Sequence, residues 1–498
     1  MSEVLSQIPL KEALRPDVTP EMGFQSYEML SSGTEYRLKQ QADFLSDSIT
    51  NPELDYPLID SDSLHAGIRK LEGILMRAHE YTDEVAAGAI WDSASYRMAE
   101  MYWLLEAKRL NQLSLEPNSD AFKLSAARYQ ELNEQLYGVP EKKVYQKAFG
   151  EVLAQAESKD LHLDAQLILD ELKHGFNFGP PGSERRIEGI KELAKGRLPT
   201  LDIAKLSTLR EVLLEDFADA RELVNTYWDE VVIPRGPDEK GRTGFNIYDM
   251  KYLFTAFRDI RDPNNEARIS VVINPGSTQL SWDTPTMSIQ IGAKRSLIED
   301  KTDMLAKIVH EYGKHGIGAV LGLKSELPVL GTGLYTEADA GERSDYLTFE
   351  EGWASLCEIA LNDTPENWKP QHISHYIAVA LAYQGADFRE SFEINWRARL
   401  LMSLKPGEQP SKEMIDRQRN QAYLSNVRIR RGTPTAVPTG QVLTFNKDLA
   451  YLHGKLDALR FLEIAGSDKQ VIRKCGFSKH DPLNKRQKYL AERYGQAR

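Results

Sequence analysis

The stretch "KIVHEYGKHGIGAV" holds the residues of this chain best suited to bind a metal ion: His310, Glu311 and His315. In the familiar H-E-x-x-H arrangement, histidines four residues apart share one helix face and bind one Zn²⁺, while the glutamate acts as general base. Here the second histidine comes five residues after the first. On an ideal α-helix, residues five apart point about 140° away from each other. A regular α-helix would therefore prevent both imidazoles from reaching one ion.

A π-bulge, or a helix that loosens at its C-terminal end, absorbs one extra residue and returns both histidines to roughly one face. Gly313 lies between the histidines and Gly316 follows them, and glycine weakens a helix at such a point. In the alternative interpretation, His310 and His315 are ordinary helix residues, one partly buried and one capping a C-terminus. The six residues alone leave both interpretations open.

A metal site of this kind needs a third ligand. Catalytic zinc sites use three protein ligands and leave one position to water, so two histidines require one more carboxylate. Glu350 and Glu351 in "LTFEEGWASL" open a predicted helix downstream. Acidic residues at a helix start also interact favourably with the helix dipole, which is a purely structural explanation. The sequence leaves the choice between Glu350 and Glu351 open.

The elements that position these residues differ along the chain. Apolar residues recur at three- and four-residue steps from about residue 65 to 230, which predicts packed helices. Two later segments rich in Val and Ile, "ARISVVINPG" and "TMSIQIGAK", are typical of strands, and the histidine-bearing segment after them is predicted to be helical. We expect "MSIQIGA" to be an exposed edge strand that aligns a peptide by main-chain hydrogen bonds. Helices are predicted again from Glu351 to about Leu404, followed by a loop-rich stretch and a final helix.

Composition limits the classes of function. The chain of 498 residues has a formal net charge of −12 and no long basic tract, which argues against nucleic acid or a membrane as partner. Its first residues lack the pattern of a signal peptide, and no apolar run approaches the roughly 18 residues that span a bilayer. Cys357 and Cys475 form no C-x-x-C pair, which suits a reducing compartment. We therefore expect a cytoplasmic protein.

Three blocks resemble the tyrosine/phenylalanine carboxypeptidase domain family, a former domain of unknown function that includes QEGLA-motif proteins and the tubulin tyrosine carboxypeptidases. "HEYGKH" is similar to the family's H-E-x-G-x-H. "FEEGWAS", preceded by "LGTGL", is similar to its QEGLA block and puts the family's glutamate at Glu351, with Glu350 and Trp353 replacing Gln and Leu. "RIRRG" and "FNKDLAYLHG" resemble R-V-x-R-G and F-T-K-D-x-x-Y-x-x-G, with matches at Arg428, Arg431, Gly432, Phe445, Lys447, Asp448, Tyr451 and Gly454.

The element pattern predicts a predominantly helical α+β protein. The resemblance, which spans roughly residues 60 to 465, implies a zincin-like metallopeptidase core with an N-terminal helical region packed on it. We expect four parts: an N-terminal extension (1–60), a helical region (61–235), a zincin-like catalytic region (236–465) and a C-terminal helical tail (466–498).

The resemblance also implies a zinc metallocarboxypeptidase that hydrolyses the C-terminal peptide bond and releases Tyr or Phe from a peptide or protein tail. His310, His315 and Glu351 would bind Zn²⁺, and Glu311 would take a proton from water and pass it to the leaving amine. The substrate carboxylate calls for a basic partner, and the candidates are Arg428, Arg431 and Lys447. Tyr451 is a candidate donor to the oxyanion.

Two other functions stay open, a non-catalytic metal-binding regulatory protein and a zinc endopeptidase. Glu311 argues against the first, because a structural zinc site needs no base. Equal cleavage of amidated and free peptides would favour the second. His372 and His375 in "QHISHY" have no acid nearby, and we expect them to be surface or packing residues. The sequence names neither the natural substrate nor the oligomeric state.

Overall fold

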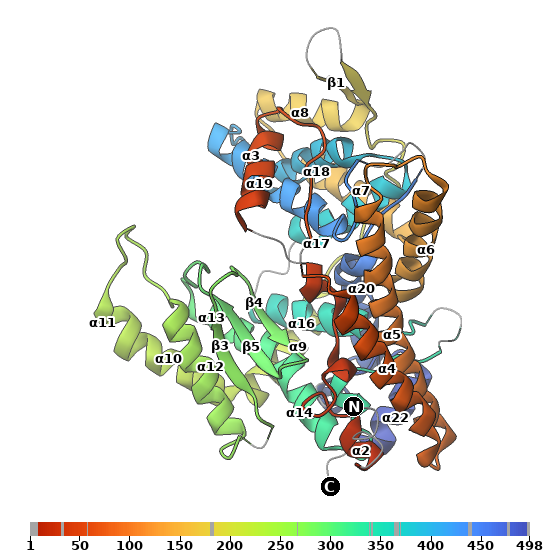
Figure 1. Cartoon of the computed structure of the whole chain (residues 1–498). Helices are drawn as coiled ribbons and strands as arrows, with labels where there is room; N and C mark the ends of the chain where they lie inside the picture. The colour runs from red at the N-terminus through yellow and green to blue at the C-terminus, as the bar shows by residue number, and fades with distance from the viewer. Residues whose placement is uncertain are drawn as a thin grey trace.

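Helices dominate the structure, a computed structural model, and small sheets accompany them (Figure 1), as the α+β prediction required. No helix among the described residues is long and apolar enough to cross a membrane. The structure describes residues 8–30, 34–56, 58–179, 184–265, 267–337, 339, 342–362, 368, 370–436, 441–475 and 479–495.

The first half is helical, as the apolar spacing predicted. Its helices begin at favourable caps: the side chains of Asp60, Asp83 and Ser119 accept hydrogen bonds from free backbone N–H groups at the starts of three of them. Two short antiparallel strands, β1 and β2, follow the helix α8. The elements are α2 (Leu10–Ala13), η1 (Pro20–Gly23), η2 (Ser26–Leu30), α3 (Thr34–Leu45), α4 (Ser61–Arg77), η3 (Ala78–Glu80), α5 (Glu84–Gln112), α6 (Asp120–Tyr137), α7 (Lys142–Glu157), α8 (Leu163–His174), β1 (Phe176–Phe178), β2 (Arg185–Ile187), α9 (Ile203–Asp216) and α10 (Ala218–Tyr227).

A three-stranded sheet comes next, after η4 (Trp228–Val232), α11 (Ile233–Arg235) and α12 (Ile247–Arg261). Its central strand is β5 (Ser288–Gly292), parallel to β3 (Ser270–Asn274) and antiparallel to β4 (Leu280–Asp283). The expectation that "MSIQIGA" is an exposed edge strand is therefore wrong, because β5 is paired on both sides and its two isoleucines are fully buried. The edge strand beside the histidine-bearing helix is β4.

The remaining elements are helical. The stretch after Leu404, predicted to be rich in loops, contains the long helix α19. Polar residues dominate this helix, so no continuous apolar stripe in the sequence indicates it. The elements are α13 (Lys301–Ile308), η5 (Val309–Gly316), α14 (Ile317–Lys324), α15 (Val329–Thr332), α16 (Leu347–Asn362), α17 (Pro370–Tyr383), α18 (Phe388–Ser403), α19 (Lys412–Ile429), η6 (Asn446–Asp448), α20 (Leu449–Ala465), α21 (Lys469–Lys474) and α22 (Lys485–Tyr494).

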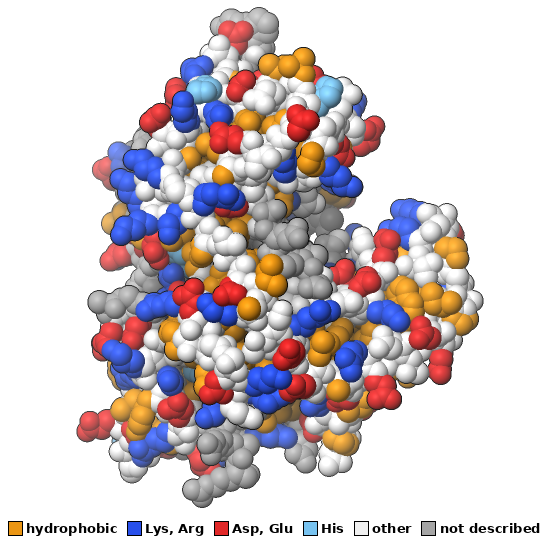
Figure 2. All heavy atoms as spheres, turned by 180° about the vertical axis from the view of Figure 1, so that it is seen from behind, with side chains coloured by type: hydrophobic (Ala, Val, Ile, Leu, Met, Phe, Trp, Pro, Cys, Tyr) orange, Lys and Arg blue, Asp and Glu red, His pale blue; other side chains and the backbone are white. Residues whose placement is uncertain are grey.

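Two hydrophobic cores hold these elements together, and each takes residues from both halves of the chain. One lies between α4, α5 and α6 and includes residues of the 327–334 and 443–445 segments. The other joins the sheet to α13, α16, α17, α18 and α20. The sheet and α10–α13 form a lobe beside the helical body (Figure 1), and from behind a notch separates this lobe from the upper helices (Figure 2). The predicted division into four parts stays a prediction.

Helices α16 and α20 cross in backbone contact, which fixes the residues they carry relative to one another. A Cβ atom on Gly352 would lie 1.8 Å from the carbonyl carbon of Gly454, and one on Gly454 would lie 1.7 Å from the carbonyl oxygen of Thr348. Only glycine permits such an approach. Both glycines belong to the blocks that carry the family resemblance, and they set the spacing between Glu351 on α16 and Tyr451 on α20.

We predict that Gly352→Ala lowers the free energy of unfolding by at least about 2 kcal/mol, because the added methyl group overlaps the α20 backbone. The matched control is Gly73→Ala on α4, where nothing lies within 4 Å of the added Cβ atom. There the better helix propensity of alanine should stabilise the protein by up to about 1 kcal/mol. Urea unfolding of the three proteins measures both effects, and a neutral Gly352→Ala would show that the two helices tolerate a wider separation.

Candidate metal centre

The helix that carries the two histidines is interrupted by a π-helix. Residues Val309–Gly316 form the π-helical segment η5 between α13 and α14, with helical backbone angles at both junctions. In a π-helix the hydrogen bond runs from residue i to i+5, so residues five apart lie about one turn apart. The predicted departure from α-helical geometry is confirmed, and it gives His310 and His315 a common face.

Both glycines of this segment also lie where an added side chain would crowd a neighbouring ring. A Cβ atom on Gly313 would lie 2.5 Å from the ring of Phe217, at the start of α10. On Gly316 it would lie 3.3 Å from the ring of Trp282, in the edge strand β4. The π-helix is thus enclosed by a helix terminus on one side and by the sheet on the other.

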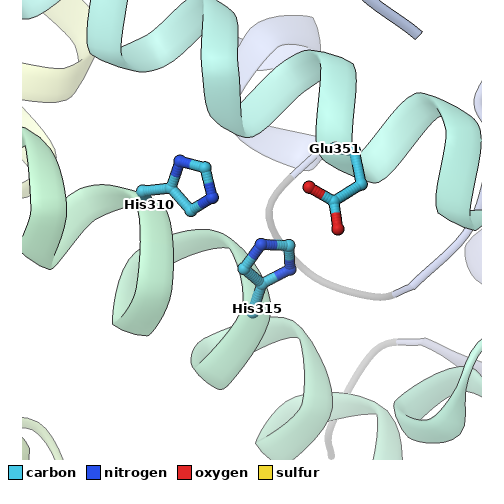
Figure 3. Close-up of side chains that lie close together, drawn as sticks. All are labelled: His310, His315 and Glu351. Carbon is cyan, nitrogen blue, oxygen red and sulfur yellow. The ribbon is translucent and has the colours of Figure 1, made fainter. Parts of the chain in front are cut away.

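His310, His315 and Glu351 converge (Figure 3). Their ligand atoms all lie within 4.8 Å of one another, and within the described chain no other group of three or more His, Cys, Asp or Glu residues does so. The imidazoles come from successive turns and face the Glu351 carboxylate on α16. A tetrahedral ion with bonds of about 2.0–2.2 Å holds its ligands about 3.4 Å apart. The three side chains therefore fit a metal ion after small rotations.

Each imidazole has a carboxylate at its Nδ1 atom. Nδ1 of His310 lies 2.7 Å from Oε1 of Glu358, and Nδ1 of His315 lies 3.3 Å from Oε1 of Glu350. Metal-binding histidines are usually oriented in this way, with the other ring nitrogen free for the ion. The arrangement leaves Nε2 of both rings for a metal, and it places Glu350 behind His315 while Glu351 faces the ion position.

The two supporting carboxylates remain ionised in spite of their burial. Burial raises the pKa of Glu358, but His310 and Lys307 more than offset it and hold the pKa well below its usual range. Burial likewise raises the pKa of Glu350, and the opposing charges of Lys479 and His315 lower it to about 2. Each carboxylate therefore stabilises the imidazole beside it.

Glu311 differs from these two acids. It is buried, with 5% of its surface exposed, and burial raises its pKa although His310 and His315 act in the opposite direction. The opposite holds for the neighbouring residue His310. Burial lowers the pKa of its imidazole, but the charges of Glu311 and Glu358 raise this pKa to about 9. A carboxylate with a raised pKa next to a metal group is suited to take up a proton.

The remaining predicted site residues gather near Tyr451. The charge of Glu351 is the largest cause of the raised pKa of Tyr451. Arg428 donates two hydrogen bonds of 2.8 Å to Asp448 and one of 3.4 Å to the Tyr451 hydroxyl. Arg428 is thus occupied by an acid and orients Tyr451.

Arg431 and Lys447 have no acidic partner within 4.0 Å among the described residues. The buried Nε atom of Arg431 has no hydrogen-bond partner, and burial together with the charge of Arg428 lowers its pKa to about 10. The Lys447 amine lies 4.4 Å from the ring centre of Tyr27 and 6.0 Å from that of Tyr451. These two cations are available to an anion.

The structure adds residues that the sequence did not indicate. Glu358 follows Glu351 by seven residues, or two helical turns. This spacing puts both side chains on one face of a helix, so the sequence could have indicated Glu358 as well. Arg399 on α18 donates to Ser374, and burial lowers its pKa to about 10; no sequence pattern marks it. Lys479 lies beside Glu350, and no sequence pattern marks it either.

His375, His372 and Trp353 are the remaining residues that the sequence singled out. His375 is half-buried, and its ring centre lies 6.3 Å from that of Tyr451, so it packs beside this tyrosine. The side chain of His372 lies outside the described residues. Trp353, which replaces the leucine of QEGLA, is buried between Phe349 and Phe461 and belongs to the core.

Comparisons with known proteins returned no match: no family model, no curated protein and no solved structure corresponds to this chain. The resemblance to the tyrosine/phenylalanine carboxypeptidase domain therefore stays a prediction based on its motifs.

We predict that His315→Ala abolishes stoichiometric metal binding and that Glu358→Gln weakens it about 10- to 100-fold, because the amide orients His310 less firmly. Elemental analysis and competition with a chelator measure the two effects. Glu326→Gln is the control, since this exposed glutamate pairs with Lys11 at the surface and should leave metal affinity unchanged. A His315→Ala protein with full metal content would contradict the assignment of the ligands.

Proposed function

We propose that the protein is a zinc metallocarboxypeptidase that hydrolyses the last peptide bond of a peptide or protein tail. The observation that carries this proposal is that buried Glu311 directly follows His310 on the π-helix whose two histidines converge with Glu351. A purely structural metal site has no use for a buried acid with a raised pKa at this point. The proposal is therefore preferred over a non-catalytic regulatory protein.

Zinc is the metal that the donor set favours. Two imidazoles and one carboxylate form a ligand set of catalytic zinc sites, in which one position is left to water. When bound, Zn²⁺ supplies a Lewis acid for the scissile carbonyl and lowers the pKa of water towards about 7. Glu358 and Glu350 lie at Nδ1 of His310 and His315, so Nε2 of each ring would bind the ion.

A zincin-like core is the matching proposal for the fold. It is supported by a ligand-bearing helix beside a small mixed sheet whose edge strand, β4, is antiparallel to its neighbour. No other strand of the described chain pairs with the outer edge of β4. That edge is free to align an extended substrate by main-chain hydrogen bonds.

Each side chain then has a defined part in hydrolysis. Glu311 takes the proton of the attacking water and later delivers it to the leaving amine. Tyr451, oriented by Arg428, donates a hydrogen bond to the carbonyl oxygen as negative charge develops on it. Arg431 and Lys447 bind the free C-terminal carboxylate, which makes the enzyme an exopeptidase. The preference for a terminal Tyr or Phe rests on the family resemblance.

We predict that Glu311→Gln retains one metal ion per chain and lowers kcat at least about 100-fold, because the amide accepts no proton. Metal content and release of the terminal residue from a peptide ending in Tyr are measured on the same preparation. Full activity of Glu311→Gln with metal retained would rule out Glu311 as the base.

We further predict that Arg431→Ala and Lys447→Ala each raise KM for a peptide ending in free Tyr about 10-fold or more and affect kcat less. Wild-type protein should not cleave the same peptide with an amidated C-terminus, which lacks the charge that these residues bind. Equal cleavage of both peptides would make the protein an endopeptidase. If neither substitution changes KM, the carboxylate is bound elsewhere.

A further inference from the structure

A lysine from the far C-terminal part of the chain reaches the metal centre. Lys479 is buried, with 1% of its surface exposed. Its Nζ atom lies 3.6 Å from Oε1 of Glu350, and the same oxygen lies 3.3 Å from Nδ1 of His315. One carboxylate oxygen thus stands between the Lys479 amine and the imidazole of a proposed metal ligand.

The surroundings of Lys479 make Glu350 its charge partner. A buried ammonium group is costly unless it is paired, and within 4.0 Å Glu350 is the one acid of the described residues that pairs with it. The amine also donates a hydrogen bond of 3.2 Å to Thr284, directly after β4. The rings of Trp282 and Tyr346 lie within 6 Å of it and keep water away. Lys479 therefore fixes the position of the Glu350 carboxylate.

The other ligand histidine has the same arrangement. Nζ of Lys307 lies 2.6 Å from Oε1 of Glu358, and that oxygen lies 2.7 Å from Nδ1 of His310. Each proposed histidine ligand is thus backed by a carboxylate that is itself paired with a lysine. Lys307 belongs to the metal-binding helix itself, whereas Lys479 comes from a separate segment.

That segment, residues 479–495, is anchored to α15 and to the chain between α15 and α16. The backbone of Lys479 donates a hydrogen bond to the carbonyl of Leu330 and accepts one from Leu334. Farther on, the side chains of Asn484 and Gln487 donate to the carbonyls of Arg343 and Ser344. These contacts hold Lys479 in place relative to Glu350, the fourth residue of α16.

We propose that Lys479 is a positioning residue of the metal centre and that the C-terminal segment is thereby a part of that centre. Lys479 holds the Glu350 carboxylate against Nδ1 of His315 and so directs Nε2 of His315 towards the ion. This inference rests on the proposed metal site, and it lies outside the residues that the family resemblance covers. A lysine that only neutralises Glu350 in the core would have no effect on metal affinity.

The test is a double-mutant cycle with Zn²⁺ affinity as the readout. Full-length wild type, Lys479→Met, Glu350→Gln and the double variant are titrated with Zn²⁺ in competition with a chelator. The visible spectrum of the Co²⁺-loaded proteins is recorded as well, because it reports the ligand geometry directly. Lys485→Met is the matched control, since this lysine lies in the same segment but is 79% exposed and pairs with Asp339 at the surface.

We expect Lys479→Met to weaken Zn²⁺ binding about 10-fold and to change the Co²⁺ spectrum, with Lys485→Met unchanged. In the Glu350→Gln background the same substitution should have no further effect, because Lys479 acts through Glu350.

Unchanged affinity in Lys479→Met, or an equal loss in both backgrounds, would overturn the inference while leaving the metal site intact. Wild-type protein that binds no Zn²⁺ would overturn the proposed function itself. If Lys479→Met does not fold, Lys479→Arg replaces it: this variant keeps the positive charge but presents it at a different distance, so weaker Zn²⁺ binding would support the inference and unchanged binding would overturn it.

Discussion

The backbone of η5 is the constraint on which the site depends. With histidines five residues apart, an α-helix would separate the imidazoles, and only the wider turn of Val309–Gly316 brings them to one face. A π-helix is rare, so we infer that its neighbours stabilise it. Phe217 and Trp282 pack where side chains of Gly313 and Gly316 would otherwise lie. The local geometry that suits a metal is therefore a product of tertiary packing.

Charge balance is the second condition for this centre. Buried carboxylates are tolerated only where opposite charges and hydrogen bonds offset their desolvation. Glu350 and Glu358 each meet one histidine and one lysine, and they remain ionised. Among the described residues no lysine pairs with Glu311 within 4.0 Å, and burial raises its pKa. The acids of α16 thus orient the two histidines, whereas Glu311 on η5 is suited to move a proton.

The sequence predicted the parts of the site that lie close together in the chain. Spacing marked His310 and His315 as candidates and left a departure from α-helical geometry as one of two interpretations, and the acidic pair at the start of α16 offered a candidate third ligand. The choice of Glu351 over Glu350 depended on which side of α16 faces the histidines, and this is set by the contact of Gly352 with Gly454. Arg399 and Lys479 come from distant segments, so no local pattern could indicate them. The edge-strand expectation failed because strand order depends on long-range pairing, which a single run of β-branched residues does not encode.

The most direct test of this account is X-ray absorption at the zinc edge of the Zn²⁺-loaded protein. The account predicts one ion per chain with two imidazole nitrogens at about 2.0–2.1 Å and oxygen ligands at a similar distance. A spectrum with one imidazole, or with none, would contradict it, because the π-helix would then fail to bring His310 and His315 to the same ion.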